Sequence, residues 1–149
     1  MKTAFFSLIL LSSTLSAAIP AHARNVKLIL PIAAAMEATG IPDRPAGSVK
    51  FFFGNQKSPE ILTKVSSYVA TPRTAAMGLS DEKACYGALL WTLVALEKRA
   101  QQVGANAVVN IVSYYQKNEM ASATEFECHV GNVIATVWLK GDLVRIGGK

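Results

Sequence analysis

Residues 80–104, SDEKACYGALLWTLVALEKRAQQVG, decide the fold, because they combine helix signals at both ends with an apolar middle. Ser80 is a good N-cap, since its hydroxyl can accept a hydrogen bond from a free backbone N–H group. The two acidic residues that follow place negative charge at the positive end of the helix dipole, and Gly104 is a typical C-terminal stop. The sequence therefore predicts a helix from Asp81 to about Val103.

Apolar residues lie on more than one side of this helix. One stripe has the spacing of a buried face and consists of Cys85, Leu89, Thr92, Leu96, Ala100 and Val103. A second set leaves almost no polar side in the first three turns: Tyr86, Leu90, Trp91, Leu93 and Val94. A helix that is apolar all round must be covered all round. We therefore expect the second set to form an interface with another copy of the chain, unless the segment Val26–Met36 folds across it.

Short β-like runs lie on both sides of the helix. We expect strands at 26–32, 49–53, 61–71, 105–115 and 124–140. The second and third of these should form a hairpin, and a brief helical turn with a loop should occupy 33–48. The order β-β-β-α-β-β indicates an α+β fold with one long helix packed on a mostly antiparallel sheet.

Two details of the last strands follow from alternation. Along 105–115, a period of two places Val109 and Ile111 on one face and Val108 on the other. In the last strand, Gly131 is expected to form a bulge rather than a hairpin turn, because a bulge keeps the residues before and after it on one continuous apolar face.

The first 23 residues, MKTAFFSLILLSSTLSAAIPAHA, have the pattern of a secretory signal peptide, with one positive charge, an apolar run and an A-x-A cleavage motif that ends at Ala23. The apolar run is shorter than the ~20 residues of a membrane-spanning helix, and no other segment approaches that length. We therefore expect a signal peptide at 1–23, a single domain at 24–149, and a periplasmic or secreted product without a transmembrane segment.

The charge of the chain is mildly positive. It has 15 Lys and Arg against 10 Asp and Glu, a formal charge of +5, and without Lys2 the charge is +4. The basic residues are scattered and no aromatic residues interleave with them, as they would in a nucleic-acid-binding groove. We therefore expect no nucleic-acid partner, and no motif indicates a cofactor.

The part from the helix onward, ALEKRAQQVGANAVVNIVSYY and then TEFECHVGNVIATVWLKGDLVRI, resembles the YbjQ-type heavy-metal-binding domains and the related domain of the RcsF envelope-stress lipoprotein. Over nearly its whole length the chain is similar to small secreted bacterial proteins that carry the label "excinuclease ATPase subunit". The resemblance implies an α+β envelope domain stapled by disulfides, and it favours self-association. The chain departs from the pattern in having two cysteines rather than four, and it lacks the phosphate-binding loop that such an ATPase needs.

Residues 123–131, ATEFECHVG, bring a cysteine and a histidine together in the chain. In a strand, Cys128 shares a face with Phe126 and Val130, which are apolar and should face the core. Cys85 lies on the buried stripe of the helix. Because exported thiols meet an oxidising compartment, the sequence predicts a Cys85–Cys128 disulfide.

Glu125, Glu127 and His129 point to the other face of that strand and form a possible metal-binding patch. A closed metal site normally needs a fourth ligand, and charges on an exposed strand are often only a solvated face. A hydrolase would have to use His129, and no G-x-S-x-G motif is present. The sequence thus favours a non-enzymatic binding or structural module of the envelope, with another envelope protein or a second copy as partner. A metal-binding protein and a small hydrolase are the alternatives.

Overall fold

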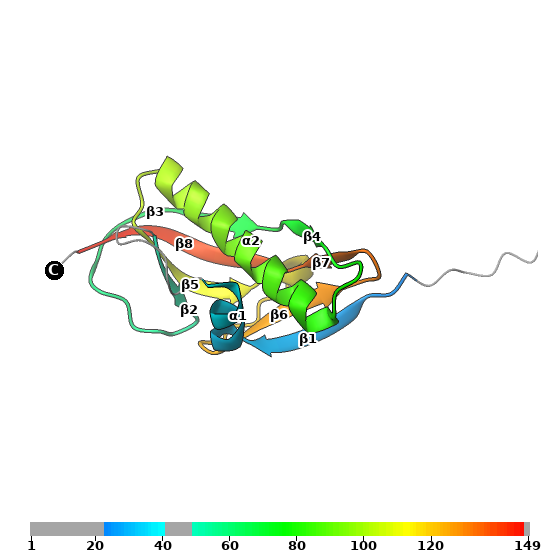
Figure 1. Ribbon diagram of the computed structural model, residues 1–149. Coiled ribbons are helices and arrows are strands. Elements are labelled where there is room, and N and C mark those ends of the chain that lie inside the picture. Colours follow the sequence, from blue (N-terminus) through cyan, green and yellow to red (C-terminus); the bar gives the residue numbers. More distant parts are fainter. Residues whose placement is uncertain (1–22, 41–48, 148–149) are drawn as a thin grey trace, which may run out of the picture.

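The computed structural model describes residues 23–40 and 49–147, which form two four-stranded sheets and a long helix packed against them (Figure 1). Sheet A has the strand order β1-β6-β7-β4 and sheet B the order β2-β5-β8-β3. The elements are β1 (Val26–Pro31), α1 (Ile32–Thr39), β2 (Lys50–Phe53), β3 (Ile61–Ala70), β4 (Arg73–Ala75), α2 (Asp81–Gln102), β5 (Ala107–Ser113), the 3₁₀ turn η2 (Tyr115–Lys117), β6 (Glu125–Val130), β7 (Ile134–Thr136) and β8 (Leu139–Ile146). The predicted α+β class is confirmed. Residues 1–22 of the predicted signal peptide and residues 41–48 of the predicted turn and loop at 33–48 lie outside the described residues, and α1 confirms the brief helical turn at the beginning of that range.

α2 begins where the sequence predicts and lies across both sheets (Figure 1). The Ser80 hydroxyl accepts a hydrogen bond from the Lys83 backbone N–H group at 3.3 Å. Gly104 follows the helix with a φ of 72°, a left-handed conformation that glycine adopts without steric cost. The predicted stripe is buried at Cys85, Leu89, Thr92, Leu96 and Ala100. None of the helices in the described part of the chain is long and apolar enough to span a membrane.

The strand pairing in sheet B differs from the predicted hairpin. β2 pairs in parallel with β5, and β3 pairs antiparallel with β8, so β2 and β3 lie at opposite edges of the sheet. The hairpin prediction was wrong because β5 and β8, which are mostly buried, take the centre of the sheet and leave its edges to β2 and β3. The other pairings between the described strands are antiparallel, as predicted.

A hairpin turn at 131–133 replaces the predicted bulge. The Gly131 N–H group donates a hydrogen bond to the Ile134 carbonyl at 2.8 Å, and His129 lies opposite Thr136. The bulge prediction was wrong because β7 folds back between β6 and β4 and completes sheet A. β4 itself was not predicted, and β8 continues beyond the predicted end of the last strand.

An irregularity in β5 breaks its alternation. Asn110 has a φ of 52°, and the register between β5 and β8 shifts after Val109. As a result Val108 and Ile111 both belong to the core under α2, while Val109 packs in a smaller separate cluster. The predicted common face of Val109 and Ile111 was wrong, because the extra residue of a bulge shifts every following side chain. Gly141 lies at this place on β8, where a Cβ atom would be 2.5 Å from the Val108 Cγ1 atom.

Cys85 and Cys128 form the predicted disulfide, with their Cα atoms 5.8 Å apart. Both cysteines are fully buried, as are Phe126 and Val130 on the same side of β6. The bond therefore lies inside the core, where it joins the beginning of α2 to the middle of sheet A.

This chain itself covers much of the second apolar set of α2. Leu93 is fully buried and belongs to the core rather than to the predicted surface. Tyr86 and Leu90 are half-buried against the core, and α1 packs on α2, which matches the alternative in which the N-terminal segment folds across the helix. Trp91 is 57 % exposed and Val94 is half-buried. Self-association stays a prediction that now depends mainly on Trp91.

Candidate functional site

Glu127 and His129 lie on the face of sheet A that is turned away from α2, beside β1. The Glu127 side chain is 9 % exposed, and one carboxylate oxygen lies 2.8 Å from the Lys27 Nζ atom. The other oxygen accepts a hydrogen bond from His129 Nε2 at 2.7 Å. Lys27 is close because β1 pairs with β6 and places it opposite His129. The strand pairing therefore builds a compact charged cluster from two strands.

The charge of Glu127 is stabilised by these neighbours. Burial of the carboxyl group acts to raise the pKa of Glu127, but hydrogen bonds from Lys27 and His129 lower the pKa below its ordinary value. Both carboxylate oxygens are in use, so the group can act as a structural anion without a further ligand.

The His129 ring is fixed on its other sides by aromatic and amide groups. Tyr115 stacks on it, with ring centroids 3.4 Å apart and an interplanar angle of 12°. The His129 Nδ1 atom lies 3.1 Å from Asn25 Oδ1, and Trp138 lies against Tyr115 at 5.2 Å between centroids. Both ring nitrogens thus have partners, which fixes the orientation of the ring.

The predicted metal patch is not assembled. Glu125 is exposed at the beginning of β6, whereas Glu127 and His129 are bonded to each other. Among residues 23–40 and 49–147, no three His, Cys, Asp or Glu side chains lie close enough to hold one metal ion. The Lys27 ammonium group, 2.8 Å from Glu127, already neutralises this carboxylate.

A groove of about 610 Å³ opens beside His129, and we call it the His129 groove. It reaches the chain before β1, the β6–β7 turn and β4, and it is lined by Ala23, Arg24, Asn25, Arg73, Tyr115, His129, Gly131, Asn132, Val133, Ile134 and Thr136. The lining includes two arginines and a histidine but no Asp or Glu. Val133 and Ile134, which are 53 % and 44 % exposed, add an apolar surface. The groove therefore combines positive charge with aliphatic and aromatic contacts.

The two arginines of the groove differ in their partners. The Arg24 guanidinium group forms an ion pair with Asp81 and donates a hydrogen bond to the Gly131 carbonyl at 3.3 Å. Arg73 is held by its backbone, which pairs with Thr136 of β7. Within the described residues its guanidinium group makes no hydrogen bond or ion pair. Arg73 is thus the cation of the groove that is free to bind a ligand.

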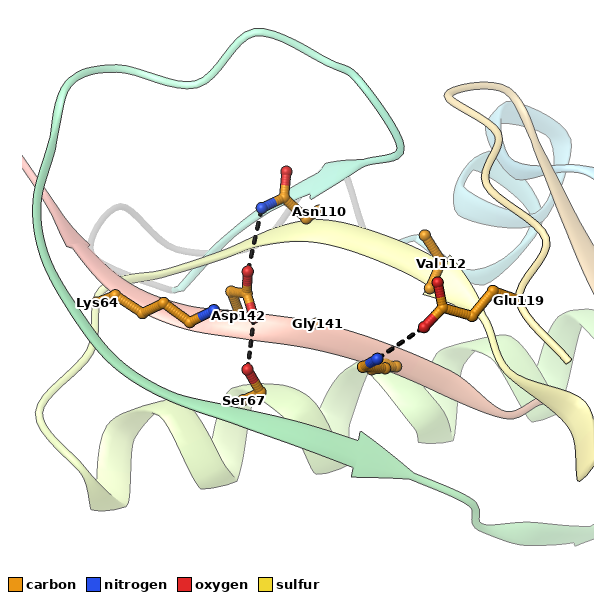
Figure 2. A pocket seen from close by; sticks show the side chains of 8 residues that line it. Lys64, Ser67, Asn110, Val112, Glu119, Gly141 and Asp142 are labelled. Atoms are coloured by element: carbon orange, nitrogen blue, oxygen red, sulfur yellow. Dashed lines mark hydrogen bonds and ion pairs between the residues drawn. The ribbon is translucent and has the colours of Figure 1, made fainter. Parts of the chain in front are cut away.

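A second hollow, of about 340 Å³, lies on sheet B around Asp142 (Figure 2). Figure 2 shows Ser67 and Asn110 directed at the Asp142 carboxylate, with the Lys64 side chain extending to it from β3. The Ser67 hydroxyl donates at 2.6 Å, the Asn110 amide at 3.1 Å, and the Lys64 Nζ atom lies 2.9 Å away. Beside them, the Lys140 Nζ atom lies 2.7 Å from a Glu119 carboxylate oxygen.

The Asp142 cluster is satisfied within the chain. Burial acts to raise the pKa of Asp142, but the hydrogen bonds from Ser67, Lys64 and Asn110 lower it below its ordinary value. The three donors come from β3 and from the irregular residue of β5, so the carboxylate ties both neighbours to β8. We interpret this hollow as a structural network that holds the bulge and the edge strand in place.

Several residues of these sites could not be found from the sequence. Arg73 lies in a strand that was not predicted, and Tyr115 reaches His129 only because the chain turns back at η2. The one available signal was the position of Arg24 directly after the predicted cleavage site. Comparison of the chain with protein-family models, with curated proteins and with solved structures finds no match.

Proposed function

We propose that this protein is a non-enzymatic binding module of the cell envelope that holds an anionic ligand in the His129 groove. The observation that carries the proposal is the free guanidinium group of Arg73 in a groove whose lining contains no carboxylate. Arginine presents a planar set of donors that matches a carboxylate or phosphate group. An anion in this groove would meet the Arg73 guanidinium group, while the carboxylates directly behind the lining, Asp81 and Glu127, are already paired with Arg24, Lys27 and His129.

The rest of the lining defines the ligand further. Val133 and Ile134 offer an apolar surface beside the positive charge, and large exposed apolar residues that gather in one place often mark a contact surface. A ligand that joins an oxyanion to an aliphatic group would use both features, whereas free phosphate would use only the charge.

The proposed location rests on the predicted signal peptide and on the disulfide. A bond between buried cysteines persists in an oxidising compartment such as the periplasm or the extracellular space. The resemblance to the domain of an envelope lipoprotein agrees with this location.

The arrangement of His129 favours binding over catalysis. A general base needs a nitrogen within reach of a nucleophile or of water, but both His129 nitrogens have protein partners and Tyr115 covers a face of the ring. His129 therefore serves as a rigid wall of the groove.

Tryptophan fluorescence can test the proposal, because Trp138 contacts Tyr115 of the groove. In a Trp91→Phe background Trp138 is the only tryptophan left. We expect N-acetyl-leucyl-leucine to bind, its C-terminal amide to bind at least tenfold more weakly, and inorganic phosphate to compete only weakly, because charged hydrogen bonds contribute about 1.5–3 kcal/mol.

Arg73→Gln should weaken binding of the carboxylate by roughly tenfold, while Arg99→Gln, which removes the same charge from the exposed side of α2, should leave it unchanged. Equal affinities for the acid and the amide, or no effect of Arg73→Gln, would overturn the proposal.

A further inference from the structure

Arg24 is the first residue after the predicted cleavage site, and it also forms part of the His129 groove. Ala23 and Arg24 both line the groove, so the peptide bond between them lies in its wall. We infer that removal of the signal peptide completes the groove as a site for a ligand with two anionic groups, because cleavage at this bond creates an α-ammonium group at Arg24. This inference rests on the proposed function and specifies the class of ligand.

The chemistry of cleavage supplies the second charge. Hydrolysis of the Ala23–Arg24 bond consumes one water molecule and leaves a carboxylate on Ala23, which departs with the signal peptide. The new amine of Arg24 takes up a proton, since an α-amino group has a pKa of about 7.7–8.0. The precursor has an uncharged peptide group at the same place. The processed groove therefore holds one positive charge that the precursor lacks.

Three contacts hold Arg24 at the groove after cleavage. Its guanidinium group pairs with Asp81 at the beginning of α2 and donates to the Gly131 carbonyl. Its own carbonyl approaches Gly131 so closely that a Cβ atom there would lie 2.9 Å from the oxygen. The side chain of Arg24 is thus used to fix the chain end, and the α-ammonium group is the charge left for a ligand.

The positions of the two cations specify the spacing of the ligand. Arg24 lies two residues before β1, and Arg73 lies in β4; β1 and β4 are the two edge strands of sheet A. Three strand spacings of about 4.8 Å separate the two strands by roughly 14 Å. The register places Arg73 level with Lys27, three residues or roughly 10 Å along the chain from Arg24. The two backbones therefore lie roughly 17 Å apart, and the Arg73 side chain can shorten that span. An extended peptide rises about 3.3 Å per residue, so a tripeptide with an acidic first residue and a free C-terminal carboxylate matches the two charges.

The experiment uses the exported protein with the Trp91→Phe change, after mass spectrometry of its N-terminus. N-acetyl-aspartyl-leucyl-leucine carries two carboxylates, and N-acetyl-asparaginyl-leucyl-leucine carries one. We expect the first to bind roughly tenfold more tightly. Acetylation near neutral pH selects the α-amine, because lysines keep their protons up to about pH 10. This modification should bring the ratio of the two affinities close to one, whereas Arg73→Gln should weaken the binding of both peptides and leave their ratio nearly unchanged.

Two controls accompany the modified protein. Peptide mapping should show a single acetyl group on Arg24, and the melting temperature should be unchanged. Transamination of the α-amine to a ketone gives a second form of the protein that loses the charge without gaining an acetyl group. This form should also bind the peptide with two carboxylates no more tightly than the peptide with one.

The outcomes separate this inference from the proposed function. An N-terminus other than Arg24 overturns the inference. So does a ratio of the two affinities that stays unchanged after both acetylation and transamination of the α-amine, while Arg73→Gln still weakens binding. In either case the proposed function stands. If neither peptide binds, both proposals are overturned.

Discussion

Glu127 depends on residues that lie far from it in the chain. Its carboxylate is nearly buried and is held by Lys27 of β1 and by His129. A buried carboxylate without partners would take up a proton or destabilise the fold. The cluster therefore links the edge strand β1 to β6 through charge as well as through backbone pairing.

Glu127→Gln should lower the free energy of unfolding by about 1–2 kcal/mol near neutral pH, because it removes two charge-assisted hydrogen bonds. The pKa of Glu127 lies below its ordinary value in the folded protein, so this stabilisation is full above the unfolded pKa of about 4.3. It is lost as the pH falls through the lower folded pKa. Urea denaturation at about pH 7 and about pH 3 should show a difference between wild type and variant that shrinks in acid.

Glu125→Gln is the matched control, because it removes the same charge from the exposed beginning of the same strand. It should change stability by less than about 0.5 kcal/mol. A difference between wild type and Glu127→Gln that stays constant down to about pH 3 would contradict the assignment.

Gly141 is a second residue whose role depends on a close approach. Gly141→Ala would place a Cβ atom 2.5 Å from Val108 and 3.3 Å from Ile111. Because both neighbours are fully buried, we expect a loss of about 1–3 kcal/mol in the free energy of unfolding from overpacking. Gly147→Ala meets nothing within 4 Å and should be nearly neutral. Equal effects of the two changes in chemical denaturation would show that β5 moves away without strain.

At the scale of elements, the disulfide joins α2 to β6 across a sequence separation of 43 residues. Closing a loop of this length restricts the unfolded chain by about 4 kcal/mol in the loop-entropy model. The double variant Cys85→Ala/Cys128→Ala should therefore unfold with a free energy about 2–4 kcal/mol lower than the oxidised protein. Reduced wild type should behave similarly in the same denaturation assay.

Non-reducing mass spectrometry of the exported protein should show the peptide of Cys85 linked to that of Cys128. Two thiols that can be alkylated after unfolding of the natively exported protein would contradict the pairing.

At the scale of the whole molecule, we expect the exposed part of the α2 surface to meet another copy of the chain. Leu93 is in the core and α1 packs on α2, but Trp91 remains exposed beside the half-buried Leu90 and Val94. We expect light scattering to show a reversible dimer at high concentration, and Trp91→Arg should abolish it. A monomeric mass for the wild type over a wide concentration range would show that the chain covers its own helix well enough.

The sequence alone determined the features that depend on local interactions. The bounds of α2 follow from Ser80 and Gly104, and the Cys85–Cys128 pair follows from two periodicities that each place a cysteine on a buried face. These features depend on interactions between residues that are a few positions apart, so the local sequence is sufficient to predict them.

The tertiary structure alone decided how the strands pair and which polar residues meet. Central β5 and β8 exclude a β2–β3 hairpin, Gly131 becomes a turn because β4 offers β7 a partner, and Asn110 bulges where Gly141 leaves room. The His129 groove likewise joins Arg24 and Arg73 from opposite edges of sheet A. Strand pairing and these polar contacts depend on burial and hydrogen bonding between segments far apart in the chain. The local sequence pattern carries no information about those interactions.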